Sequence, residues 1–108
     1  MKGIKFQNEN DRKAWFLERG ILNKYCEQLK AINFFSAPAG MKHHGAYNGG
    51  LFDHSANVAD VLETYTANLG LEWEREESPY IVGMLHDLCK VDQYEYDLET
   101  DSFKWSNE

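Results

Sequence analysis

The chain has 108 residues, of which 43% are hydrophobic, so it is long enough for one domain with a small core. Its formal charge is −7, from 18 acidic and 11 basic residues, which disfavours a general nucleic-acid binder because such proteins need a basic surface. The charge still allows a nucleotide as ligand. The two cysteines form no CxxC pair and no apolar run reaches membrane-spanning length. We therefore expect a cytoplasmic protein with reduced thiols and no membrane partner.

The first part of the chain is predicted to be helical. A polar lead-in over residues 1–9 precedes a helical pattern that starts at Asp11, with Asn10 or Asp11 as the expected N-cap. Gly20 is expected to divide this pattern into two helices. The block INFFSAPAG, which contains a proline and a glycine, ends the second of them.

A long helix is predicted next, after the glycine-rich loop GMKHHGAYNGG at residues 40–50. We expect it over about 51–69, ended by Gly70. Its predicted apolar stripe consists of Leu51, Val58, Val61, Leu62, Tyr65 and Leu69. His54 stands four residues before Val58, so the spacing predicts that His54 lies on the buried face.

A shorter helix and a hairpin complete the predicted fold. Ser78 and Pro79 are expected as N-cap and first-turn proline of a helix that runs from Pro79 to about Lys90. QYEYD and SFKW then alternate polar with aromatic residues, which is typical of a β-hairpin over residues 93–106. The sequence therefore predicts an all-α core of four or five helices with a small C-terminal β-hairpin.

The pair His86–Asp87 stands inside the apolar run YIVGMLHDLCK. A charged pair in a core is costly unless something neutralises it, and a divalent ion does so. Neighbouring residues lie about 100° apart around a helix, so both side chains can reach one ion beside it. His54 from the preceding helix completes a set of two imidazoles and one carboxylate, which is typical of transition-metal sites. Lys90 shares their surface and is suited to hold a phosphate oxygen.

These residues resemble the HD superfamily of metal-dependent phosphohydrolases, whose ligand pattern is H…HD…D. The first three ligands match His54 in GGLFDHSANVA, and His86 and Asp87 in MLHDLCK. The stretch HHGAYNGGLFDHS is similar to bacterial HD proteins that carry an HHxxYxGGLxxHS run, among them a group of 3′–5′ exoribonucleases. The resemblance covers about residues 33–92 and implies an HD-domain-like helical bundle.

The resemblance also implies a reaction, the hydrolysis of a nucleotide or another phosphate ester by a metal-bound hydroxide. His54, His86 and Asp87 would hold the divalent ion, whether Mn, Ni, Co, Fe, Zn or Mg. Asp87 and Lys90 are the expected catalytic residues, and Lys90 steadies the charge that develops on the phosphoryl oxygens.

Substrate contacts are expected from Lys90 and from the glycine-rich loop. His44 is predicted to face the site, and the alternative is that His43 and His44 form a solvated loop pair. Tyr47 is expected to shape the loop close to the ligand. The expected partner is a phosphorylated small molecule, namely a nucleotide, and no stable nucleic-acid complex is expected.

The family pattern ends with an aspartate on a later helix, and this chain has no match to it. Asp92 and Asp97 follow the dyad directly and match no family position. We therefore expect residues 1–108 to form a single, incomplete HD domain, either the first part of a longer domain or a shortened one.

Two alternatives follow from this departure and from the motif. One is an exoribonuclease-like HD nuclease, which the acidic charge disfavours. The other is a catalytically inactive HD remnant that serves as a binding or assembly module. If the missing helices leave the hairpin aromatics uncovered, those residues favour a homo-oligomer; they are Tyr94, Tyr96, Phe103 and Trp105.

Overall fold

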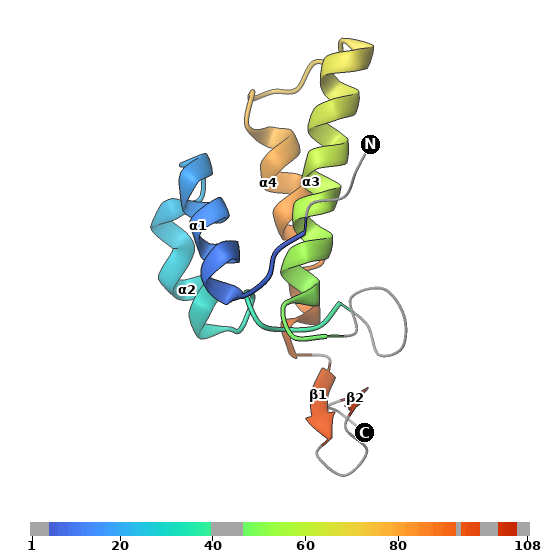
Figure 1. Ribbon diagram of the computed structural model, residues 1–108. Coiled ribbons are helices and arrows are strands. Elements are labelled where there is room, and N and C mark those ends of the chain that lie inside the picture. The colour runs from blue at the N-terminus through green and yellow to red at the C-terminus, as the bar shows by residue number, and fades with distance from the viewer. Residues whose placement is uncertain (1–4, 40–46, 93, 98–101, 106–108) are drawn as a thin grey trace.

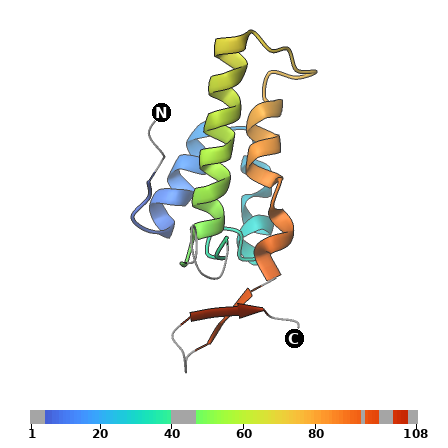
Figure 2. The same ribbon diagram turned by 90° about the vertical axis from the view of Figure 1, so that its right-hand side faces the viewer.

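The fold is mostly helical, as the sequence predicted. The computed structural model describes residues 5–39, 47–92, 94–97 and 102–105. Within them lie the four α-helices α1 (Glu9–Arg19), α2 (Cys26–Ala31), α3 (Gly50–Leu69) and α4 (Ser78–Leu85), and the 3-10 helices η1 (Asn23–Tyr25) and η2 (Leu88–Asp92). α3 and α4 lie side by side, and α1 and α2 cover one side of that pair (Figures 1 and 2). None of the described helices is long and apolar enough to cross a membrane.

Two short strands follow the helices, β1 (Tyr94–Asp97) and β2 (Ser102–Trp105). They pair in antiparallel fashion, with Tyr94 opposite Trp105 and Tyr96 opposite Phe103. The pair lies at one end of the helices, beyond η2 (Figure 2). The aromatic side chains of these strands lie outside what the structure describes, so their role in self-association stays a prediction.

The ends of α1 follow local hydrogen-bonding rules. Asn8 is the N-cap, and its side-chain oxygen accepts a hydrogen bond of 2.8 Å from the backbone N–H of Asp11. The prediction of Asn10 or Asp11 as the cap was wrong, because the helix already contains both residues. Gly20 ends the helix with φ of 70°, in the left-handed region that glycine adopts without strain. The predicted division at Gly20 is confirmed.

The ends of α3 and α4 match the sequence in part. α3 ends at Gly70 as predicted, with φ of 64°. α4 starts one residue earlier than expected, because Glu77 occupies the N-cap position and Ser78 lies inside the helix. It also ends at Leu85, not near Lys90. The chain then turns, and a hydrogen bond from the N–H of Lys90 to the carbonyl of Asp87 begins the tighter winding of η2.

The core is an aromatic cluster around Phe52 of α3, which is fully buried. Phe52 lies within 6.3 Å, between ring centroids, of the rings of Phe6, Trp15, Phe16, Phe34 and Phe35. Most of these ring pairs meet edge to face, a favourable geometry for aromatic side chains. The cluster therefore joins α1 and the segment after α2 to the first half of α3.

The predicted apolar stripe of α3 was wrong over its second half. Tyr65 and Leu69 are 53% and 69% exposed. The buried face of the helix is made instead by Leu51, Phe52, Ser55, Ala56 and Ala59. Tyr65 and Leu69 are exposed because the aromatic cluster contacts only the first half of α3. Small side chains of α3 let α4 come close instead.

The helices α3 and α4 approach each other closely at Ala59 and Gly83. A Cβ atom placed on Gly83 would lie 2.4 Å from Cα of Ala59 and 2.6 Å from its backbone nitrogen. Backbone atoms cannot move away as a flexible side chain does. Glycine at position 83 is therefore what allows the two helices to pack at this distance.

We predict that Gly83→Ala lowers the free energy of unfolding by about 1–3 kcal/mol, because the added methyl group overpacks the α3–α4 contact. Urea denaturation followed by circular dichroism measures the effect. Val82→Ala, at a neighbouring position that is 47% exposed, is the matched control and should shift the midpoint little. An unchanged midpoint for Gly83→Ala would mean that the helices are not in close contact here.

Candidate metal centre

The structure brings together the two histidines and the aspartate that the motif singled out. His54 lies in the second turn of α3, and His86 and Asp87 form the turn that follows α4. One ligand atom from each of the three lies within 4.8 Å of the others. They meet at Oδ2 of Asp87, which is 3.3 Å from Nε2 of His54 and 3.1 Å from Nε2 of His86.

The orientation of His86 is set by its own helix. Its Nδ1 lies 2.7 Å from the carbonyl oxygen of Gly83. Because a carbonyl only accepts, Nδ1 carries the hydrogen, and Nε2 of the neutral ring is left with a free lone pair. This bond also occupies a carbonyl that would otherwise accept an N–H in a continuing α-helix, which explains why α4 ends at Leu85.

Nε2 of His86 lies 3.1 Å from Oδ2 of Asp87, and in the neutral ring with the hydrogen on Nδ1 it is a second acceptor facing that oxygen. Two acceptors at this distance repel each other unless a proton or a metal ion lies between them. A histidine whose other ring nitrogen donates to a backbone carbonyl is the usual arrangement for a metal ligand. The donor set and its orientation both fit a divalent cation with a preference for nitrogen ligands.

His54 is 42% exposed, so the prediction that it lies on the buried face was wrong. The core face of α3 is centred on Phe52 and Ala56, and His54 lies beside it. Partial burial lowers the pKa of His54 below 6.5, and the neighbouring His86 lowers it further, against the opposing effect of Asp87. The neutral ring, which is the form that binds a metal, is therefore favoured.

Lys90 lies next to the three candidate ligands. Its Nζ is 3.6 Å from Oδ2 of Asp87 and donates a 3.1 Å hydrogen bond to the carbonyl oxygen of Ala39. Its side chain is 30% exposed. The ammonium group is thus held beside the cluster while part of the side chain remains open to solvent.

A second polar cluster, which the sequence analysis missed, includes Asp53, the residue next to His54 on α3. Arg12 donates from Nε to Oδ1 of Asp53 at 2.8 Å and from Nη2 to Oδ2 at 3.2 Å. Both residues are 7% exposed. The signal was present in the sequence, because an arginine four residues before a core phenylalanine, Phe16, lies on the buried face of its helix and needs a carboxylate partner.

Tyr47 belongs to this second cluster. Its hydroxyl donates a 2.6 Å hydrogen bond to Oδ2 of Asp53. Desolvation and the bond to Asp53 raise the pKa of Tyr47 to about 12, so it is a neutral phenol at physiological pH. Among the described residues its hydrogen bond goes to Asp53 and not to the His54–His86–Asp87 cluster. His44 lies outside the described residues, and its role stays a prediction.

Comparison with known proteins gives no match: no family model, curated protein or solved structure matches the chain. The resemblance to the HD superfamily therefore remains a prediction from the motif.

We predict that Asp53→Asn lowers the free energy of unfolding by about 3–5 kcal/mol, because it leaves the buried Arg12 without a counter-charge. This is a large share of the roughly 5–15 kcal/mol typical of a small domain. Tyr47→Phe should cost only about 1.5 kcal/mol or less, since it removes one partly exposed hydrogen bond. Urea denaturation measures both, with Asp60→Asn on the same helix as control. Equal effects of Asp53→Asn and Asp60→Asn would contradict the prediction.

We predict that His54 makes the metal-free protein less stable in acid. The unfolded chain takes up this proton near pH 6.5, and the folded chain takes it up only at lower pH, because its pKa is lowered. The stability present above pH 6.5 is therefore lost as the pH falls through the folded pKa. NMR titration of the ring proton gives the pKa directly. A value above 6.5, or an identical pH dependence of stability in His54→Gln, would contradict this.

Proposed function

We propose that the chain is a metal-dependent phosphohydrolase of the HD type that acts on a nucleotide or another phosphate ester. The observation that carries the proposal is the convergence of two imidazole nitrogens and one carboxylate oxygen, from two separate stretches of chain, within 4.8 Å. The placement of the first ligand on α3 and of the dyad after α4 supports an HD-domain-like bundle, and the strand pair fits the predicted hairpin.

The three candidate ligands are suited to one ion. His86 is oriented by the carbonyl of Gly83, with Nε2 toward Asp87. His54 favours the neutral, metal-binding form. Among the described residues this group has three members, which leaves coordination positions for water and substrate. A divalent cation bound here lowers the pKa of a coordinated water and polarises a phosphoryl oxygen.

Two residues of the chain, Asp87 and Lys90, have further roles in the proposed reaction. Asp87 would offset the charge of a bound cation, and its 3.6 Å contact with Lys90 keeps the ammonium group beside the cluster. Lys90, anchored on the carbonyl of Ala39, presents a positive charge to the phosphoryl oxygens as negative charge develops on them. Because His54 is partly exposed to solvent, the phosphate group of a substrate can reach the His54–His86–Asp87 cluster from this side.

We predict that protein purified without chelator binds one divalent transition-metal ion per chain and hydrolyses bis(p-nitrophenyl) phosphate or a nucleotide in the presence of Mn²⁺. His86→Ala should abolish the activity and weaken metal binding at least about tenfold, because it removes a ligand whose orientation the fold has already fixed. Metal analysis, calorimetric titration with Mn²⁺ and release of p-nitrophenol measure these effects.

Asp60→Asn is the matched control, since it removes a carboxylate from the same helix as His54 without touching the cluster. Full activity in His86→Ala would rule out the mechanism. Metal binding without hydrolysis of any phosphate ester would instead favour the inactive binding module, and stepwise shortening of an oligoribonucleotide would favour the exoribonuclease.

A further inference from the structure

A group of exposed apolar side chains lies at the end of α3 that is remote from the two strands (Figures 1 and 2). Tyr65 and Leu69 are four residues apart, so they share one face of the helix. Leu71 and Trp73 follow in the connection to α4, and all four side chains are exposed. These four residues form the α3-end patch.

Thr66 holds the residues of the α3-end patch together. Its carbonyl accepts a 3.1 Å hydrogen bond from the N–H of Leu71, which turns the chain back at the end of the helix. Its hydroxyl accepts a 2.7 Å hydrogen bond from Nε1 of Trp73. Thr66 follows Tyr65 directly and precedes Leu69 by one turn. The indole ring is therefore fixed beside the exposed face of α3, with its polar atom already bonded.

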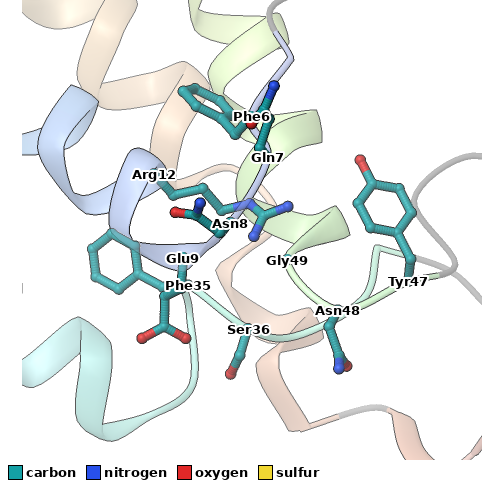
Figure 3. Close-up of a pocket in the computed structure, with 10 residues that line it drawn as sticks. All are labelled: Phe6, Gln7, Asn8, Glu9, Arg12, Phe35, Ser36, Tyr47, Asn48 and Gly49. Atoms are coloured by element: carbon teal, nitrogen blue, oxygen red, sulfur yellow. The ribbon is translucent and has the colours of Figure 1, made fainter.

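The connection beside the patch is strongly acidic. Residues 71–77 include four exposed glutamates and one arginine, and two of the glutamates stand directly before and after Trp73. Within the described part of the chain none of the four forms an ion pair, so their charges remain available to a partner. The side chain of Arg12 at the cavity beside α1 (Figure 3) differs in this respect, since Asp53 offsets its charge within the fold.

These charges distinguish between the occupants that an apolar patch could have. A second copy of the chain in a symmetric contact would place the same glutamates against each other, and like charges repel. Anionic lipids and nucleic acids are disfavoured for the same reason. A protein segment with basic and apolar residues is complementary in both respects. Because the exposed face belongs to a helix, a second helix can pack along it with its own apolar residues at i and i+4.

We propose that the α3-end patch binds a basic amphipathic helix of a partner protein. The apolar face of that helix covers the patch, and its lysines or arginines meet the glutamates of the connection. Trp73 is the expected anchor, because tryptophan is enriched among the residues that dominate binding energy. The contact is small, so we expect micromolar affinity that falls as salt is added. The proposal is independent of the metal cluster and of the proposed function.

The test is an NMR titration of the full chain with a synthetic amphipathic helix of leucine and lysine, about 18 residues long. One comparison peptide has the same composition in scrambled order, and another has glutamate in place of lysine. The leucine–lysine helix should bind saturably and shift the indole N–H signal of Trp73 and the amide signals of residues 69–77. The scrambled peptide should bind at least about tenfold more weakly, and the glutamate peptide should not bind.

Leu69→Ala should weaken binding of the leucine–lysine helix about fivefold or more, because it removes apolar surface from the patch. Leu17→Ala is the matched control, since Leu17 is an exposed leucine on α1. The double variant Glu72→Gln and Glu74→Gln should weaken binding and reduce its salt dependence.

The matched control for charge is the double variant Glu18→Gln and Glu27→Gln, which removes two exposed carboxylates from other helices. Equal affinities for the ordered and scrambled peptides, shifts confined to other parts of the protein, or equal effects of the variants and their controls would each overturn the proposal. A dimer in the absence of peptide that Leu69→Ala dissociates, measured by sedimentation, would also overturn it, because a second copy would then occupy the patch.

Discussion

The contact between Ala59 and Gly83 is the constraint on which the candidate centre depends. Because neither residue has a large side chain, the backbones of α3 and α4 come close enough for His54 to meet the turn after α4. Gly83 has a second effect, since its carbonyl fixes the ring of His86. One glycine therefore sets both the distance between the two helices and the direction of one ligand. A bulkier residue would separate the imidazoles even though every ligand remained in the sequence.

Two carboxylates, one on α3 and one after α4, are neutralised in different ways. Asp53 is buried and takes two hydrogen bonds from Arg12 and one from Tyr47, so its binding capacity is largely used within the fold. Asp87 is more exposed, and among the described residues its carboxylate meets histidine nitrogens and the more distant Lys90. The first arrangement is typical of a structural ion pair, and the second leaves a carboxylate oxygen able to bind an added cation.

Local sequence signals predicted the helix ends that are formed by glycine, because such an end depends on the conformation of one residue. Gly20 and Gly70 end their helices because each adopts a positive φ, and a glycine after an apolar pattern is a direct signal of this. The motif also predicted the meeting of His54 with His86 and Asp87. That prediction came from the metal-ligating residue types and was supported by the resemblance, whereas the apolar spacing of α3 placed His54 on the wrong face.

The features that sequence missed depend on contacts between distant segments. Nothing near Tyr65 or Leu69 in the sequence shows that α4 and the aromatic cluster leave these two side chains exposed. The pairing of Arg12 with Asp53 joins residues 41 positions apart. The position of Arg12 relative to Phe16 indicates that it is buried, but nothing in its own window identifies Asp53 as its partner. The early end of α4 was missed because a hydrogen bond from the side chain of His86 competes with the backbone hydrogen bonds of the helix. Helical periodicity gives no indication of such a bond.

The adjacency of Asp53 and His54 has a consequence for how this sequence can change in length. A single insertion between Gly49 and Asp53 would rotate the following residues by about 100° around the helix axis, and would take both side chains from their partners at once. Residues 70–77, which connect α3 to α4, are exposed throughout and carry neither cluster. Insertions and deletions in that connection leave both clusters in register, so homologous chains should differ in length there and keep a fixed spacing at the start of α3.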